Sequence, residues 1–168
     1  MKPLKPADVV RLAPLIWNIN QNKGWHDPMP STIAMKLNTM CEVAEMWEDY
    51  RRGRLKEPAD KPIEVRGRRM ARGEEEFADI AIRAMHQWEV NRRGGSSGEL
   101  DEISVALWEA VSPGDEFGLA TKAVVPCALC KRLNRIAVAV GVSDPLECIV
   151  AKMEFNKTRP WRHGGLAA

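Results

Sequence analysis

Four carboxylates recur in pairs along the chain. Glu42 and Glu45 form one pair, and Glu76 and Asp79 form the other, each at i, i+3. On a helix this spacing places both members of a pair on the same side. Carboxylate oxygens are the ligands that Mg²⁺ prefers in proteins. Two such helices facing each other would repel unless a cation lay between them, so the pattern indicates a metal site shared by both.

A third group of polar residues lies near the end of the chain. Lys152, Asn156 and Arg159 follow one another at i, i+4 and i+7, so they share one side of a helix that stops before Pro160. Cations and an amide suit phosphate oxygens, and an arginine can bind them through two parallel hydrogen bonds. Acidic pairs alone also describe a solvated helix face. Cations near a helix C-terminus complement the helix dipole, but that does not account for Asn156.

The elements that must position these residues are predicted to be helices, and no sheet is expected. The first helix is predicted at about 8–22, followed by a loop at 23–30. Ser31 can cap the second helix, which continues to about Arg52. After a long connection at 53–73, the third helix spans roughly 74–91. The apolar side of the first helix is expected to comprise Val9, Val10, Leu12, Leu15, Ile16 and Ile19.

The second half of the chain begins with a flexible linker at 93–98. A helix at about 99–111, a turn at 112–114 and a helical stretch at 115–140 follow, and Pro126 is expected to divide that stretch. The last helix starts with Asp144 as its cap and Pro145 in its first turn, and ends near Thr158. We therefore predict one all-α domain over 1–168, a helical bundle with an inserted helical segment at about 92–142.

The two acidic helices each have a polar arc and an apolar arc. On the second helix the acidic arc holds Glu42, Glu45, Glu48 and Asp49, and the opposite arc holds Ile33, Leu37, Met40, Ala44 and Trp47. On the third helix Glu76, Asp79 and Arg83 lie against Phe77, Ile80, Ala81, Ala84, Met85 and Trp88.

Composition sets the broad class. The chain has 168 residues, of which 45% are hydrophobic and 29% charged, as in an ordinary soluble globular protein. A net charge of +2 gives no argument for a nucleic-acid partner. No apolar run is long enough to span a bilayer and no signal peptide is recognised, so no membrane partner and a cytoplasmic location are expected. Cys41, Cys127, Cys130 and Cys148 are expected to pack as small hydrophobes.

Four segments, in this order, resemble the MazG-like family of all-α nucleoside triphosphate pyrophosphohydrolases. They are residues 23–27 (KGWHD), 42–45 (EVAE), 75–83 (EEFADIAIR) and 152–165 (KMEFNKTRPWRHGG). The last segment carries the most specific pattern, and the ordered set is more specific than any one segment. Unlike the smaller members of the family, this chain places about 60 residues between the third helix and the last.

The resemblance implies a helical bundle that assembles as dimers or dimers of dimers. It implies a Mg²⁺ site, which Mn²⁺ could also fill, with Glu42, Glu45, Glu76 and Asp79 as metal ligands. It implies cleavage of a nucleoside triphosphate between the α- and β-phosphates, giving the monophosphate and pyrophosphate. Lys152, Asn156 and Arg159 would then contact the phosphates.

Three residues carry the expected catalysis. Lys152 and Arg159 would offset the charge that builds up on the phosphoryl oxygens. Glu45 would orient the attacking water or act purely as a metal ligand. Trp25 would either stack on the base or plug the end of the bundle.

Other classes of protein remain open at this point. The chain could be a helical interaction or regulatory module whose acidic faces pair with a basic partner or with a second protomer. It could bind nucleic acid through the arginines of the long connection, although the nearby acidic helices would repel DNA and a solvated loop explains them better. These arginines are Arg51, Arg52, Arg54, Arg66, Arg68, Arg69 and Arg72. A di-iron bundle fits poorly, because no histidine follows Glu42 or Glu76 at i+3.

Overall fold

Five helices and one short hairpin are found in the part of the chain that the structure describes. The computed structural model describes residues 1–96, 103, 107 and 125–160. The helices are α1 (Pro6–Asn22), α2 (Thr32–Arg51), α3 (Arg72–Arg92), α5 (Pro126–Val140) and α6 (Pro145–Thr158). The prediction of an all-α fold is confirmed. None of the described helices is both long enough and apolar enough to cross a bilayer. The helix predicted at 99–111 and the turn after it lie largely outside the described residues.

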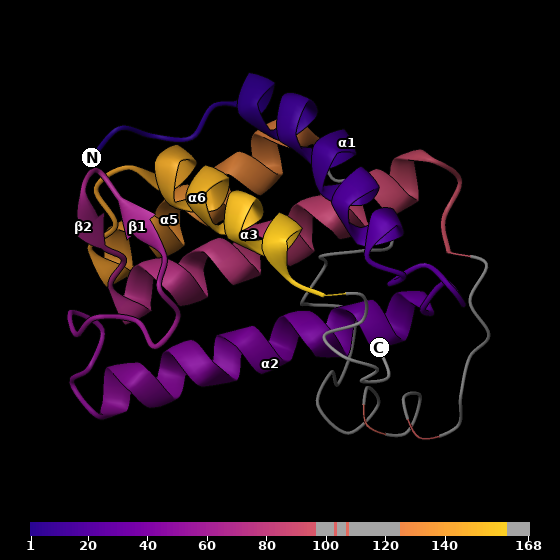
Figure 1. Cartoon of the computed structure of the whole chain (residues 1–168). Helices are drawn as coiled ribbons and strands as arrows, with labels where there is room; N and C mark the ends of the chain where they lie inside the picture. Colours follow the sequence, from indigo (N-terminus) through magenta and orange to yellow (C-terminus); the bar gives the residue numbers. More distant parts are fainter. Residues whose placement is uncertain (97–102, 104–106, 108–124, 161–168) are drawn as a thin grey trace.

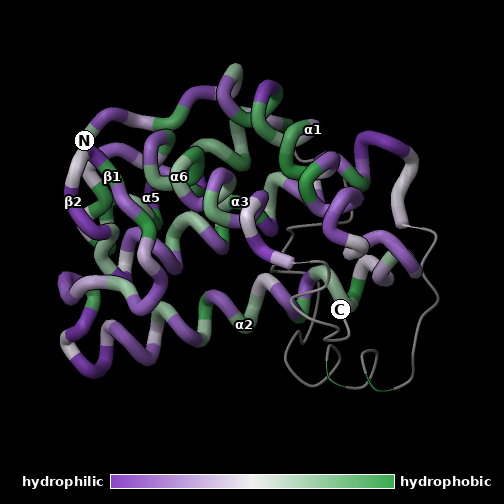
Figure 2. Tube along the Cα trace, in the orientation of Figure 1, coloured by the Kyte–Doolittle hydropathy of each residue, from purple (hydrophilic) through white to green (hydrophobic). Residues whose placement is uncertain are grey.

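Helix α3 is the centre of the bundle. It packs against α1, α2, α5 and α6 (Figure 1). Its predicted apolar side is buried, with Phe77, Ala81 and Met85 fully enclosed and Ile80 nearly so. Figure 2 shows apolar residues along the elements that surround it. Because α5 packs on both α1 and α3, the end of the inserted segment forms part of the bundle core.

Helix α1 has a narrower buried face than predicted. Val9, Leu12 and Ile16 are buried, together with Ala13. These positions follow the i, i+3, i+4, i+7 pattern of one helix face. Val10 and Leu15 are 52% and 46% exposed. Placing those two on the buried side was wrong, because the helical step turns them away from α3.

The predicted helix ends are largely confirmed. The hydroxyl of Ser31 accepts a hydrogen bond from the backbone N–H of Ala34 at 3.1 Å, which caps α2. The carboxylate of Asp144 caps α6 by accepting from the backbone N–H of Glu147 at 3.3 Å. Pro126 begins α5 rather than kinking a longer helix. Gly141 ends α5 in the left-handed conformation, at φ 80°.

The prediction that no sheet would form was wrong. A two-stranded antiparallel hairpin, β1 (Glu64–Val65) and β2 (Arg68–Arg69), lies in the connection between α2 and α3. Its two-residue turn, Arg66-Gly67, has positive φ at both positions (54° and 71°), as tight hairpin turns require. Strands of two residues are too short to show an alternating pattern, so only the glycine of the turn marked them in the sequence.

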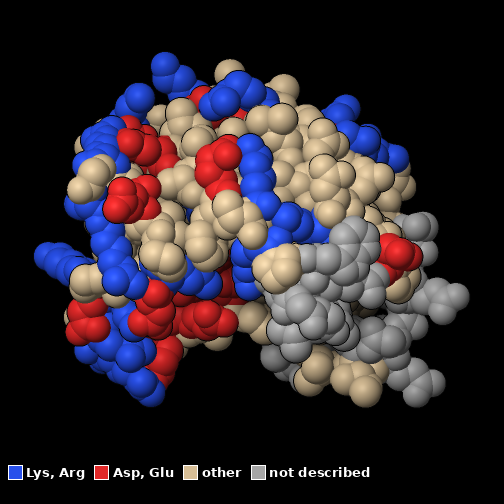
Figure 3. Space-filling model, in the orientation of Figure 1, with Lys and Arg blue, Asp and Glu red and all other residues tan. Residues whose placement is uncertain are grey.

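The arginines of this connection are bound to neighbouring acidic groups. Arg54 pairs with Asp49, Arg68 with Glu74 and Arg72 with Asp60. The guanidinium of Arg66 bonds to Asp144 and Glu147 at the start of α6. Figure 3 shows positive and negative side chains intermingled at this end of the molecule. The arginines therefore fasten the hairpin to the helices.

The four cysteines divide into two groups. Cys130 and Cys148 are buried, as predicted for small hydrophobes. Burial raises the pKa of Cys130 to about 11 and that of Cys148 to about 12, so neither is a ready nucleophile. Cys41 and Cys127 are exposed, which corrects the prediction for these two.

Candidate active site

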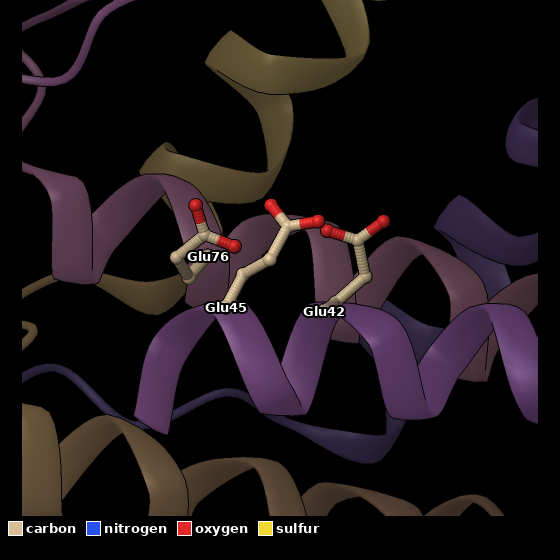
Figure 4. A group of neighbouring side chains, drawn as sticks. All are labelled: Glu42, Glu45 and Glu76. Carbon is tan, nitrogen blue, oxygen red and sulfur yellow. The ribbon is translucent and has the colours of Figure 1, made fainter. Parts of the chain in front are cut away.

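The acidic faces of α2 and α3 meet. Glu42 and Glu45 from α2 and Glu76 from α3 each bring one carboxylate oxygen within 4.8 Å of the other two. Figure 4 shows the three carboxylates pointing toward one another across the two helices. The i, i+3 spacing placed Glu42 and Glu45 on one side of α2, and the packing of α2 on α3 adds Glu76.

Glu76 is a member of this cluster that has no cation beside it among the described residues. Burial, together with the nearby carboxylates of Asp79, Glu45 and Glu42, raises the pKa of Glu76 to about 8. Glu76 Oε2 is buried and has no hydrogen-bond partner within the described residues. A buried carboxylate oxygen without a donor is costly. A divalent cation between the three glutamates would satisfy that oxygen, so the donor set fits a hard metal ion.

Asp79 interacts with Lys152 rather than joining the three glutamates. The Lys152 ammonium lies 2.5 Å from Asp79 Oδ2 and 2.6 Å from Glu75 Oε1. Lys152 is completely buried, so it serves as the internal counter-ion of α3. Burial raises the pKa of Asp79 and the nearby Glu42 carboxylate adds to this, whereas Lys152 lowers it. The structure thus places Lys152 beneath the site rather than on its surface.

A pocket of about 420 Å³ opens beside the carboxylates. Six of the eight residues predicted from the sequence line it, namely Trp25, Glu42, Glu45, Asp79, Asn156 and Arg159. Glu76 lies in the carboxylate cluster and Lys152 lies below, and neither lines the pocket. The loop after α1, the acidic helices and the end of α6 therefore converge on one hollow, although they are far apart in the sequence.

The end of α6 brings unsatisfied polar groups to this pocket. Asn156 Oδ1 is buried without a hydrogen-bond partner in the described part of the chain. The guanidinium of Arg159 forms no ion pair with any described residue. The backbone carbonyl of Arg159 accepts a hydrogen bond from Lys23 Nζ at 2.6 Å, which ties α6 to the loop after α1. An amide oxygen and an unpaired guanidinium suit a ligand that carries both donors and negative charge.

The chain was compared with family models, curated proteins and solved structures. No match was found in any of the three.

Two cations that the sequence did not single out also lie at the pocket. Arg83 donates to Glu42 Oε1 through Nε at 2.6 Å, and its Nη2 lies 2.5 Å from the same oxygen. Its signal was present, because it follows Asp79 at i+4 on the polar arc of α3. Lys61 reaches Glu75 Oε1 at 2.6 Å from the connection before α3. No local pattern could have found Lys61, since its contact depends on the path of that connection.

A cluster of aromatic rings lies behind His86 at the pocket wall. His86, on α3, lines the pocket, and its Nε2 lies 2.8 Å from Nε2 of His26. The His26 ring lies 4.3 Å from that of Trp17, and the Arg93 guanidinium lies 4.7 Å from the same Trp17 ring. Burial, together with the neighbouring His26 and Arg83, lowers the pKa of His86 to about 3. His86 is thus neutral in the folded protein at ordinary pH.

The neutral state of His86 predicts a pH dependence of stability. His86 has a pKa of 6.5 in the unfolded chain and of about 3 in the folded protein. Between these two pH values the unfolded chain binds a proton at His86 and the folded protein does not. The free energy of unfolding should therefore fall as pH drops through this window, by about 1.4 kcal/mol per pH unit from this group. Glu76 acts in the opposite direction, because the folded protein binds its proton from about pH 8 downward.

The measurement is therefore a difference between two proteins. Urea unfolding of the natural protein and of His86→Gln should be followed at pH 7, 6 and 5. The stability of the natural protein relative to the variant should decline by about 2 kcal/mol over that range. Parallel pH profiles for the two proteins would contradict a buried neutral His86.

Proposed function

We propose that this protein is a Mg²⁺-dependent nucleoside triphosphate pyrophosphohydrolase. It would cleave its substrate between the α- and β-phosphates, releasing a nucleoside monophosphate and pyrophosphate. The observation that carries the proposal is a single pocket next to three converging carboxylates and lined by Asn156 and Arg159. Hard oxygen ligands for a metal and donors for phosphate oxygens are the two requirements of such a site.

Glu42, Glu45 and Glu76 are the residues that would hold the metal. The buried Oε2 of Glu76, which has no hydrogen-bond partner among the described residues, supports this assignment. When bound, Mg²⁺ supplies positive charge to phosphate oxygens and makes a neighbouring water more acidic. Asp79, already paired with Lys152, would act on the site as a neighbouring carboxylate of fixed position.

The chain's own cations and amide would bind the triphosphate. Arg159 is the first of these, because it lines the pocket and its guanidinium pairs with no acidic side chain among the described residues. Lys61 lines the same pocket, and the carboxylates of Glu75 and Asp79 help to raise its pKa to about 12, so it stays charged. Lys61 therefore takes the phosphate-contacting role that the resemblance gave to Lys152. Lys152 would instead hold Glu75 and Asp79 in place.

The remaining pocket wall suits the nucleoside. Trp25, Ile82 and His86 provide flat or apolar surface, and Asn20 and Asn38 provide amide groups. A base has a π-face and hydrogen-bonding edges, and these are the complementary surfaces. Glu45, the most exposed of the three glutamates, is placed to orient the attacking water.

The direct test is a panel of ribo- and deoxyribonucleoside triphosphates assayed for pyrophosphate release with Mg²⁺. Release of pyrophosphate and monophosphate in equal amounts is expected, with no release when the metal is chelated. Release of inorganic phosphate instead would mean cleavage at the γ-phosphate. No turnover of any nucleotide, together with no Mg²⁺ or Mn²⁺ binding by calorimetry, would favour the alternative of a helical interaction or regulatory module.

Nucleic-acid binding is less well supported than nucleotide hydrolysis. The arginines that could have contacted a phosphate backbone are engaged with Glu48, Asp49, Asp60, Glu74 and Asp144. Binding to DNA would have to break these ion pairs before counterions could be displaced.

Replacing Arg159 by alanine is expected to lower kcat/KM about 10- to 100-fold, mainly through a higher KM. The guanidinium would be lost from the pocket while the carboxylates remain. Steady-state kinetics with the best substrate of the panel would measure this. Lys157→Ala is the matched control, because Lys157 lies on the same helix but pairs with Glu154 on the surface. Unchanged kinetics in Arg159→Ala would remove the phosphate role.

A further inference from the structure

His26, in the loop after α1, and His86, on α3, share a hydrogen bond at the pocket wall. Their Nε2 atoms lie 2.8 Å apart, and the two ring planes are inclined by only 13°. The ring centroids are 5.1 Å apart, which is as far as two imidazoles can lie while these nitrogens are in contact. The rings therefore meet head to head, and one hydrogen lies between the two nitrogens in a nearly linear bond.

Both rings are neutral in the folded protein. Burial and the nearby Arg93 lower the pKa of His26, and the pKa of His86 is about 3. A neutral imidazole carries one N–H, on either Nδ1 or Nε2. Because one Nε2 donates to the other, the two rings are in opposite tautomers. The donating ring has a bare Nδ1, and the accepting ring carries its hydrogen on Nδ1.

The surroundings of His26 decide between the two arrangements. Its Nδ1 is buried and has no hydrogen-bond partner among the described residues. A buried N–H without an acceptor is rarer in proteins than a buried acceptor without a donor. His26 therefore keeps Nδ1 bare and donates from Nε2. His86 accepts at Nε2, so its own hydrogen is on Nδ1.

His86 lies at the end of the pocket that is far from the carboxylates. It follows Asp79 at i+7, about two turns and about 10 Å along the axis of α3, and both residues line the pocket. His26 is the one hydrogen-bond partner of His86 among the described residues, so Nδ1 is the ring nitrogen left for a ligand. A triphosphate beside the carboxylates would direct its base toward His86. The part of a nucleotide farthest from its phosphates is the Watson–Crick edge of the base.

We propose that Nδ1–H of His86 donates to a carbonyl oxygen of the nucleobase, and that His26 is the positioning residue that holds His86 in this tautomer. The inference rests on the proposed function and adds the base preference of the same pocket. A fixed donor suits the carbonyl of uracil, thymine, guanine or hypoxanthine and opposes the amino group of cytosine or adenine. Asn20 and Asn38 do not impose this choice, because a rotated amide presents either its oxygen or its NH₂.

Matched substrates measure the preference. In dUTP a carbonyl replaces the amino group that dCTP carries at the Watson–Crick edge, and ITP differs from ATP in the same way. The value of kcat/KM is expected to be at least about 10-fold higher for dUTP than for dCTP, and for ITP than for ATP.

Three variants separate reading of the base from packing. His86→Phe should bring the ratio of dUTP to dCTP within about 3-fold of unity, because the donor is lost. His26→Phe should do the same, although His26 does not line the pocket. Trp17→Phe is the matched control: the Trp17 ring lies 4.3 Å from that of His26 but takes no part in the shared hydrogen bond, so the ratio should not change.

NMR spectra of the natural protein with isotope-labelled histidine read the tautomers at pH 7 without any nucleotide. His26 is expected to carry its hydrogen on Nε2 and His86 on Nδ1, and His163→Gln identifies the signals of the third histidine. Titration with dUMP should shift the His86 signals at a concentration at least about 10-fold lower than titration with dCMP. These two measurements do not require turnover, so they decide the base preference even if no triphosphate is hydrolysed.

Three results would overturn the proposal. A hydrogen on Nε2 of His86 in these spectra would reverse the assignment of the pair. Equal or reversed preference between the carbonyl and the amino bases would show that His86 does not read a carbonyl. A preference for dUTP that survives His86→Phe would place the contact on another residue. The expected tautomers and tighter binding of dUMP, without hydrolysis of any triphosphate, would contradict the proposed reaction and support the base preference.

Discussion

Replacing Glu45 by glutamine is expected to reduce kcat at least about 100-fold. Glutamine preserves the shape of the side chain but removes one of the three carboxylates that converge between α2 and α3. The fold should persist, because removing one like charge from a crowded cluster relieves repulsion on Glu76. Loss of turnover with undiminished thermal stability would therefore indicate a catalytic rather than a structural residue.

The matched control for this prediction is Glu48→Gln. Glu48 lies one turn further along α2 and pairs on the surface with Arg51 at 2.8 Å and Arg52 at 2.6 Å. Its replacement should leave kcat and KM unchanged, since exposed ion pairs contribute little and it does not line the pocket. Retained activity in Glu45→Gln would contradict the proposed metal site, of which Glu45 is one of the three carboxylates.

The local features of the site could be predicted from sequence. Glu42 and Glu45 share one side of α2 because helical periodicity fixes their relation whatever surrounds them. Asn156 lies in the last turn of α6, whereas Arg159 follows the end of that helix in extended conformation, so the prediction that Arg159 continues the helix was wrong. The spacing within each segment, together with the order of the segments, was enough to anticipate six of the residues that line one pocket.

What could not be predicted depends on packing over long distances. Lys152 lies within α6 and is completely buried, whereas Arg159 follows the end of α6 in extended conformation and lines the pocket. The packing of α6 on α3 and the point at which α6 ends decide these two positions. Lys61 contacts Glu75 from the connection before α3, and α2 buries Glu42 and Asp49 while Trp47 of its apolar arc is exposed. Periodicity gives the faces of a helix but not the neighbour of each face.

The internal charges of α3 and α6 form one connected arrangement. Lys152 contacts Asp79 and Glu75, and Glu75 also contacts Lys61 at 2.6 Å. Glu75 thus links a buried cation to one at the pocket wall. Replacing one of these charged side chains should therefore change both the stability of the fold and the position of the groups that face the pocket.

Replacing Lys152 by methionine is expected to destabilise the fold by about 3–5 kcal/mol. The change keeps the length of the side chain but leaves Asp79 without its cation inside the protein, where an unpaired charge is costly. Glu75 retains Lys61, so most of the cost falls on Asp79. In a domain of this size the expected fall in Tm is roughly 10 °C, measurable by calorimetry.

Two further proteins separate this structural role from a direct contact with phosphate. Lys157→Met removes a lysine from the same helix whose side chain is 49% exposed and bound to Glu154, and should change Tm by no more than about 3 °C. Adding Asp79→Asn to Lys152→Met removes both charges of the buried pair and should recover part of the lost stability. If Lys152→Met kept its Tm and raised only KM, the ammonium would be contacting substrate. Lys152 is completely buried between two carboxylates, so we expect Lys152→Met to lower the Tm.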